Sequence, residues 1–138
     1  MNNTRFATNI HILTLLAKFP DEWLSSDFIS KSIQINAVMV RKELSLLQNI
    51  GWISTKKGKE GGSKLQAKSE EITLADLYIA IKSSNVLGKK NECEGSDCPI
   101  GEQINQELEK LFQETDEVVI HSLKSKNLKD FVEQFNHV

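Results

Sequence analysis

The sequence predicts a mainly α-helical protein that contains one short β-hairpin. Its apolar residues recur at intervals of three and four along several stretches, which is the period of an amphipathic helix. The exception lies near residue 60, where two short strand-like runs flank a turn rich in glycine and lysine. The chain has 138 residues, 39% of them hydrophobic, which is enough for one compact domain with an added oligomerisation element.

Three helices are expected in the N-terminal part. The first spans residues 5–19 and stops before a proline, and a short second helix begins at Ser25 or Ser26. The third follows Asn36, a favourable N-cap residue, and ends at Gly51, the usual C-terminal residue of a helix. The apolar side chains expected to face the core from the second and third helices are Phe28, Ile29, Ile33, Val40, Leu44, Leu47 and Ile50.

A β-hairpin is expected after the third helix. Residues 52–55 and 63–66 have the composition of strands, and the turn between them is rich in glycine and lysine. Three helices followed by a basic hairpin form the pattern of a winged helix-turn-helix domain, in which the hairpin is the wing. We therefore expect a winged helix-turn-helix DNA-binding domain over residues 1–83.

The rest of the chain is expected to form a loop and further helices. Thr73 is the N-cap of a fourth helix, and Pro99 suits the first position of a long one. A cysteine-containing loop over residues 84–99 separates the two. Residues 100–138 then hold the long helix, as a dimerisation element, and a short last helix over 128–135. The residues of the fourth helix expected to be buried are Leu74, Leu77, Ala80 and Ile81.

Charge divides the chain into two halves of opposite sign. Residues 1–68 hold ten Lys/Arg and five Asp/Glu, a net of +5, whereas residues 69–138 hold seven and fourteen, a net of −7. The two add to the net charge of −2 for the whole chain. This asymmetry indicates a basic half that meets phosphate and an acidic half that stays away from it. The alternative is chance clustering on a soluble surface.

The start of the third helix and the hairpin form the candidate DNA-binding surface. A helix reads a duplex with its N-terminal side chains in the major groove, where small residues such as Ala37 and Val38 allow close approach. Arg41 has the donor geometry for a guanine or a phosphate, and the hairpin lysines have the charge to neutralise phosphates. An ordinary solvated helix and a mobile loop are the alternatives, but the two features together favour double-stranded DNA. The predicted DNA-contacting residues are Asn36, Ala37, Val38, Arg41, Lys42, Lys56, Lys57, Lys59, Gly61, Gly62 and Lys64.

The long helix carries an apolar stripe that predicts a homodimer. The stripe extends over about five turns. This is more apolar surface than a single terminal helix buries within its own subunit, so we expect the stripe to pair across a two-fold axis. The alternative is that it packs entirely within its own subunit. The predicted dimerisation residues are Ile104, Leu108, Leu111, Thr115 and Val118.

The two cysteines, Cys93 and Cys98, form a candidate redox-sensing pair. Two thiols are too few for a zinc or iron–sulfur site, which normally needs four ligands, so no metal is expected. Cys98 lies at the expected start of the long helix, where the helix dipole stabilises a thiolate, although neighbouring carboxylates oppose this effect. The alternative is a pair of inert thiols in a reducing cytosol.

Other classes of protein lack support in the sequence. There is no phosphate-binding glycine motif, no G-x-S-x-G and no H-E-x-x-H, so an enzyme is not expected. No run approaches the ~20 apolar residues that span a bilayer, and no secretory signal is evident. We therefore expect a cytoplasmic protein with no membrane partner.

Four stretches, taken together, are similar to one known family. Residues 35–53 resemble its recognition helix and first wing strand, 58–67 its wing motif G-x-x-G-G, and 71–81 its next helix. Residues 98–101 (CPIG) open the long helix. On these motifs the chain resembles the Rrf-two family of bacterial winged-helix regulators, whose members include IscR, NsrR and CymR. The variants CPIG and VMVRK (residues 38–42) point to its YwnA-like branch.

The resemblance implies a homodimer through the long helix, an inverted-repeat operator and repression by occlusion. Family members that hold an iron–sulfur cluster use three cysteines in the loop before that helix. This chain lacks the third, so no cofactor is expected. It also lacks the aromatic residue that often follows Gly-Gly in the wing, since Ser63 and Lys64 stand there.

The expected function is that of a sequence-specific DNA-binding transcription regulator, a repressor that binds an inverted-repeat operator as a homodimer. Two alternatives stay open. One is a winged-helix adaptor that binds proteins without specific DNA binding. The other is a regulator whose thiols sense oxidants or electrophiles.

Overall fold

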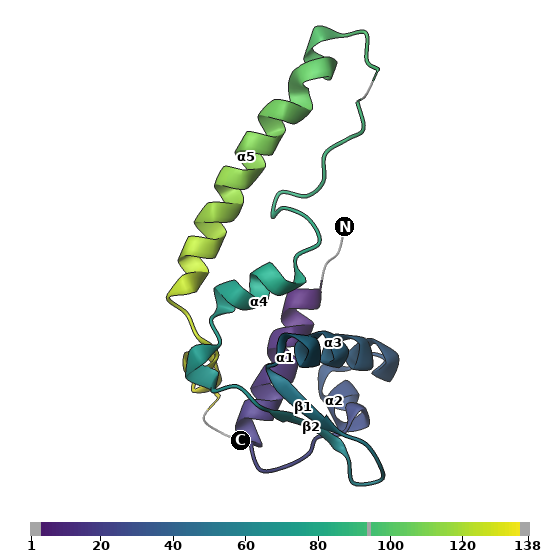
Figure 1. Cartoon of the computed structure of the whole chain (residues 1–138), viewed down its shortest axis with the longest axis vertical. Helices are drawn as coiled ribbons and strands as arrows, with labels where there is room; N and C mark the ends of the chain where they lie inside the picture. The colour runs from purple at the N-terminus through teal and green to yellow at the C-terminus, as the bar shows by residue number, and fades with distance from the viewer. Residues whose placement is uncertain (1–3, 94, 136–138) are drawn as a thin grey trace.

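The computed structural model describes residues 4–93 and 95–135, and it is mainly helical with one small antiparallel sheet (Figure 1). The fold class expected from the sequence is confirmed. None of the described helices is long and apolar enough to cross a membrane. In chain order the elements are α1 (Arg5–Lys18), α2 (Ser26–Ile33), α3 (Ala37–Ile50), β1 (Ile53–Lys56), β2 (Gly62–Leu65), the 3-10 turn η1 (Ser69–Glu71), α4 (Leu74–Ile81), α5 (Pro99–Lys124) and α6 (Leu128–Val132).

Side-chain caps define where α2 and α3 begin. The Ser25 hydroxyl accepts a hydrogen bond from the N–H of Phe28 at 3.1 Å. Asn36 Oδ1 accepts one from the N–H of Val38 at 2.7 Å, which satisfies a donor that a helix start otherwise leaves unpaired. At the other end of α3, Gly51 has a φ of 92°, a left-handed conformation that favours glycine. The local sequence therefore sets both ends of α3.

The sheet joins the wing to the segment before α2. β1 and β2 pair antiparallel, with Ile53 opposite Leu65 and Lys56 opposite Gly62. Leu24 extends the sheet beyond β2, because its N–H and C=O exchange hydrogen bonds with Ser63 at 3.0 and 2.8 Å. These bonds fix the wing to the turn between α1 and α2.

The core lies between α1, α3 and the C-terminal α6. Its largest fully buried side chains include Leu13 and Leu16 on α1, Leu47 on α3, and Leu128 on α6. α6 thus packs back onto α1, although 46 residues of loop and long helix separate α6 from the end of α4. The first and the last helix of the described chain therefore pack against each other in this core.

Three details of the expected core are wrong. Phe28 is 46% exposed, because the short α2 buries only Ile29 fully while Phe28 lies edge-on against the ring of Phe19. Ile50 is 38% exposed, because it is the last residue of α3 and extends past the body. Ala80 is half-buried rather than buried. Strand bounds also shift by about one residue, and α6 ends three residues earlier than expected, both at ends where hydrogen bonding decides the limit.

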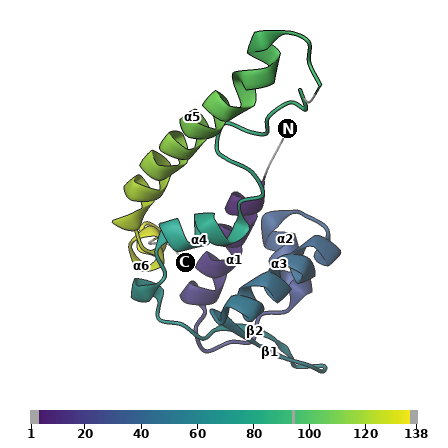
Figure 2. The ribbon, with the colours of Figure 1, turned by 45° about the horizontal axis from the view of Figure 1, so that its top comes forward.

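α5 stands away from the body as a long rod and packs mainly on α4 (Figures 1 and 2). Phe112 and Asp116 are its two buried residues. The irregular segment after α4 runs back along this helix, where Lys90 forms an ion pair with Glu109 and the carbonyl of Asn91 accepts a hydrogen bond from Asn105. Lys90 and Asn91 therefore hold this segment against α5.

Candidate nucleic-acid interface

The first turns of α3 are presented to solvent. Val38 is 61% exposed and Met39 is 48% exposed, and both Arg41 and Lys42 are exposed as well. The opposite side of the helix packs into the core through Val40 and its neighbours. The capped start of α3 is therefore a rigid element with a free outer face, as recognition helices are. Met39 also belongs to this face, and the sequence analysis did not name it among the DNA-contacting residues.

Arg41 borders a groove between α3 and the wing. The groove has a volume of about 410 Å³, with Arg41 and Ser26 on one side and residues 55–58 and 61–63 on the other. One Arg41 guanidinium nitrogen lies 3.4 Å from the Ser26 hydroxyl, a long contact that leaves the other donors available. α2, α3 and the hairpin thus bring cationic and hydroxyl side chains to one edge.

Two of the wing lysines lie over an aromatic ring. The ammonium of Lys64 is 4.9 Å from the centre of the Trp23 ring, and that of Lys56 is 5.8 Å away. Both distances are within the range of cation–π attraction, which limits where these side chains point. Lys57 and Lys59 lie beyond the ring on the exposed turn. Trp23 is a residue that sequence reasoning missed, since only the tertiary structure brings it to the wing.

Steric limits explain the glycines of the wing. A Cβ at Gly61 would collide with the backbone carbonyl of Lys56, and one at Gly62 would lie 2.5 Å from the carbonyl oxygen of Leu24. Gly58 has a φ of 107°. These glycines are needed to close the turn and to join it to Leu24. A contact of Gly61 or Gly62 with DNA stays a prediction.

A buried ion pair lies on the inner side of α3. The Glu43 side chain is 3% exposed, and Arg5 binds both of its oxygens, at 2.8 and 2.9 Å. Burial raises the pKa of Glu43, but the hydrogen bond and charge of Arg5, together with smaller effects of Asn9 and Lys42, outweigh burial, so the net pKa is lowered. A charged residue within an apolar helix stripe was the sequence signal for this pair, and our sequence reasoning did not use it.

The apolar stripe of α5 faces solvent in the single chain. Ile104 is 37% exposed, Leu111 48% and Val118 69%, while Leu108 and Thr115 are half-buried. The face that α5 turns to its own chain is a different one, which contains Asn105, Glu109, Phe112 and Asp116. The stripe thus remains available to a partner.

The cysteines belong to the start of α5 and the segment before it, and this part of the chain lies at the far end of the structure from the wing (Figure 1). Cys93 is half-buried, and Cys98 is exposed at the N-cap of α5. The nearby backbone N–H groups of Gly101 and Ile100 lower the pKa of the Cys98 thiol. Within residues 4–93 and 95–135, no group of three or more His, Cys, Asp or Glu side chains has the arrangement of a metal site.

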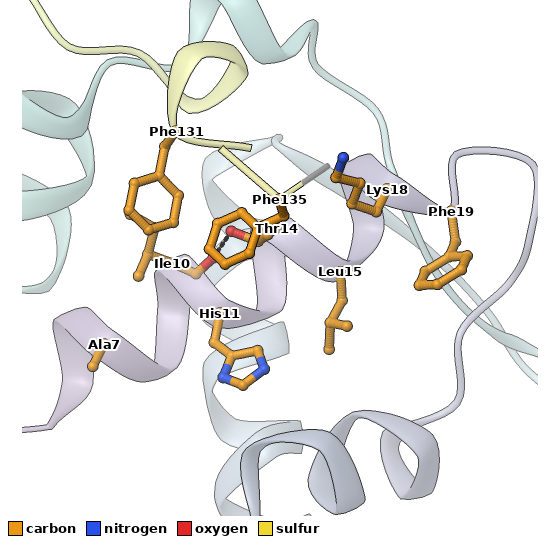
Figure 3. A pocket seen from close by; sticks show the side chains of 9 residues that line it. All are labelled: Ala7, Ile10, His11, Thr14, Leu15, Lys18, Phe19, Phe131 and Phe135. Atoms are coloured by element: carbon orange, nitrogen blue, oxygen red, sulfur yellow. Dashed lines mark hydrogen bonds between the residues drawn. The ribbon is translucent and has the colours of Figure 1, made fainter. Parts of the chain in front are cut away.

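An apolar pocket lies between α1 and α6 (Figure 3). It has a volume of about 290 Å³, and Ile10, Phe131 and Phe135 are among its walls. Two of its lining residues make hydrogen bonds: Thr14 donates to the Ile10 carbonyl at 2.7 Å, and Nε2 of His11 lies 3.0 Å from the Ser32 hydroxyl. Among the described residues that line it none is a carboxylate, and its two ionisable side chains are His11 and Lys18.

Comparisons with known proteins agree with this arrangement. The sequence model of the Rrf2 (Rrf-two) family, described as an iron-dependent transcriptional regulator, matches residues 2–134. The chain's two cysteines do not fit an iron–sulfur cluster, and the described residues contain no alternative ligand set. YwnA of Bacillus subtilis (strain 168), assigned as an HTH-type transcriptional regulator, is 33% identical over 138 residues, which is 100% of this chain and 99% of YwnA.

Solved structures share the fold. A transcriptional regulator from Lactobacillus plantarum superposes with a TM-score of 0.80 at 24% identity, over 97% of this chain and 91% of that one. CymR of B. subtilis superposes with a TM-score of 0.71 at 18% identity, over 99% of this chain and 98% of CymR. The match to the family model over nearly the whole chain and the identity to YwnA establish that this protein belongs to the Rrf2 family of transcriptional regulators, which are not enzymes.

Proposed function

We propose that this regulator binds double-stranded DNA as a homodimer and represses transcription by covering an inverted-repeat operator. The observation that carries the proposal is the groove between α3 and the wing, which has exposed cationic side chains on both sides. A recognition helix beside a basic hairpin fits a major groove and the adjacent backbone or minor groove. Access to chromosomal DNA places the protein in the cytoplasm.

Each side chain of the surface has a role that follows from its chemistry. Arg41 reads a base, because its planar donors match the two acceptors of guanine. Lys42 and the wing lysines Lys56, Lys57, Lys59 and Lys64 bind phosphates. Asn36 uses its carbonyl oxygen to cap α3, which leaves its amide N–H₂ to donate to the duplex. The small side chains of Ala37 and Val38 allow the helix start to approach the base edges.

The second element of the proposal is the dimer. The stripe Ile104, Leu108, Leu111, Thr115 and Val118 pairs with its copy across a two-fold axis, as its exposure in the single chain supports. Two recognition helices related by this axis read two half-sites about 34 Å apart. In this arrangement residues 1–83 bind DNA, the segment 84–99 connects, and residues 100–138 carry the dimer helix and the last helix.

Selection of bound duplexes from a random DNA library tests the proposal, followed by mapping of genome-wide occupancy. We expect an inverted repeat to be enriched. The binding constant for this repeat should fall steeply with salt, with a slope of about −0.9 per neutralised phosphate in a log–log plot. A protein that enriches no sequence, or whose affinity for DNA does not depend on salt, is instead an adaptor that uses the same surface for protein partners.

A second candidate function, thiol sensing, is favoured by one observation. Cys98 is exposed, and its pKa is lowered by the first N–H groups of α5. Alkylation or oxidation there alters the start of the dimer helix and would change half-site spacing. We expect at most a modest loss of operator affinity after peroxide treatment of the wild type, and none in the Cys93→Ser, Cys98→Ser double variant. An equal response of both proteins removes the cysteines from sensing.

A further inference from the structure

Among residues 4–93 and 95–135, two acidic side chains are buried. The side chain of Glu43 on α3 is 3% exposed, and that of Asp116 on α5 is 5% exposed. A buried carboxylate is strongly destabilising unless charged or hydrogen-bonded partners surround it. The two residues lie on the helix that we assign to base reading and on the helix that we assign to dimerisation. Their partners show how these two helices are connected.

At the first site, Arg5 links α3 to the end of α4. Its Nε and Nη2 bind the two oxygens of Glu43, at 2.9 and 2.8 Å. Its remaining nitrogen, Nη1, donates to the main-chain carbonyl of Ile81 at 3.3 Å. Ile81 is the last residue of α4. One guanidinium therefore binds the inner side of α3 and the end of α4 at the same time.

At the second site, Asp116 binds the segment that begins at Lys82, directly after the end of α4. It accepts hydrogen bonds from the Lys82 ammonium at 3.0 Å, from the Asn85 amide at 2.7 Å and from the Val86 N–H at 2.7 Å. The Tyr78 hydroxyl, on α4, is 3.3 Å away. Asp116 thus holds residues 82–86 against α5. The two buried sites meet at the adjacent residues Ile81 and Lys82.

We propose that Arg5 and Asp116 are positioning residues, which set the orientation of α3 relative to α5 through residues 81 and 82. The inference rests on the proposed function, since it assigns these residues to the geometry of two half-sites. Bidentate, charge-assisted hydrogen bonds add geometric specificity to the orientation that helix packing already favours. In a dimer any rotation of α3 about the end of α4 changes the separation of the two recognition helices, and this separation determines which operator spacing fits.

The test measures spacing preference rather than affinity alone. Wild-type protein first selects an inverted repeat from a random library, and duplexes with one or two base pairs added or removed between the half-sites are then made. We expect Arg5→Gln and Asp116→Asn to reduce the ratio of affinities for the selected spacer and the altered spacers by about fivefold or more. Asp116 is remote from the proposed DNA surface, so a change at this residue reports on geometry.

Two controls separate positioning from stability. Lys110→Gln breaks an exposed ion pair with Glu107 on the same helix as Asp116 and should leave the ratio unchanged. Leu128→Ala removes a fully buried side chain of α6 and lowers stability without touching either site, so it should also leave the ratio unchanged. Light scattering on every variant shows whether the dimer persists.

If Arg5→Gln does not fold because Glu43 loses its partner, the double variant Arg5→Gln, Glu43→Gln removes both charges and leaves no buried ion unpaired. It should show the same loss of spacing preference. Variants that bind every spacer with the wild-type ratio, or that weaken equally at all spacers, overturn the inference and make these residues stabilising only. If the wild type selects no repeat, the proposed function fails, and this inference fails with it.

Discussion

The substitution Leu111→Glu tests the dimer most directly. Leu111 lies at the centre of the exposed stripe of α5, and 48% of its surface is open in the single chain. Complete burial of a leucine side chain contributes about 1.5–3 kcal/mol, so covering the exposed half contributes about 0.7–1.4 kcal/mol per subunit. A two-fold interface contains the residue twice, which doubles the effect to about 1.4–2.8 kcal/mol.

This free energy corresponds to a dissociation constant raised by about 10- to 100-fold. Two carboxylates placed in an apolar interface add their own desolvation, so the upper end of this range is expected. A dimer with micromolar affinity therefore becomes a monomer at the same concentration. Operator binding weakens with it, because one half-site alone supplies about half of the contacts.

Light scattering over a concentration series measures the effect, with Gln106→Glu as the matched control. Gln106 is exposed on the same helix and lies outside the stripe, so this variant carries the same added charge and should remain dimeric. A wild type that is monomeric at tens of micromolar, or a Leu111→Glu protein that dimerises as the wild type does, would refute the assignment of the stripe to the interface.

Four further predictions concern single residues. Asn36→Ala removes the cap of α3 and should lower the free energy of unfolding, measured by urea titration, by about 0.5–2 kcal/mol. An unchanged free energy would show that the 2.7 Å hydrogen bond from the Val38 N–H to Asn36 does not stabilise the helix. Arg41→Ala should weaken binding to the selected duplex by about 1–3 kcal/mol in a mobility-shift titration and relax specificity at one base pair; unchanged affinity would remove it from the interface. Iodoacetamide at neutral pH should modify Cys98 faster than Cys93 in peptide mass spectra, because helix N–H groups lower the pKa of Cys98; equal rates would contradict this. The pKa of Asp116 is lowered in the folded protein, so its stabilisation is present above its unfolded pKa of about 3.9 and is lost as pH falls through the folded pKa. Asp116→Asn should therefore flatten the loss of stability below about pH 4, and identical acid unfolding of both proteins would count against the buried carboxylate.

Local signals in the sequence were sufficient for most of the fold. The side-chain caps Ser25 and Asn36 and the glycine at position 51 act on backbone groups a few residues away, so their effect is readable without the tertiary structure. The period of apolar residues identified the helices for the same reason. The exposed face of α3 and the lysines of the wing followed from this local order.

Contacts between distant segments were decided only by the tertiary structure. Trp23 meets the wing because Leu24 pairs with Ser63, and nothing near Trp23 in the sequence indicates this. The apolar period of α5 does not show which face of the helix packs on its own subunit. Only the contacts of α5 with α4 and with the segment after α4 show that Phe112 and Asp116 lie on that inner face.

By itself, the sequence determined the fold class, the order of the elements, the capped helix and the basic hairpin, because each depends on interactions within one or two turns of chain. The tertiary structure decided how these elements face one another. It placed Glu43 beside Arg5 and Asp116 beside Lys82, pairs separated by 38 and 34 residues. A buried charge is stable only with a partner of defined geometry, and that partner comes from whichever helix the packing of the core brings within reach.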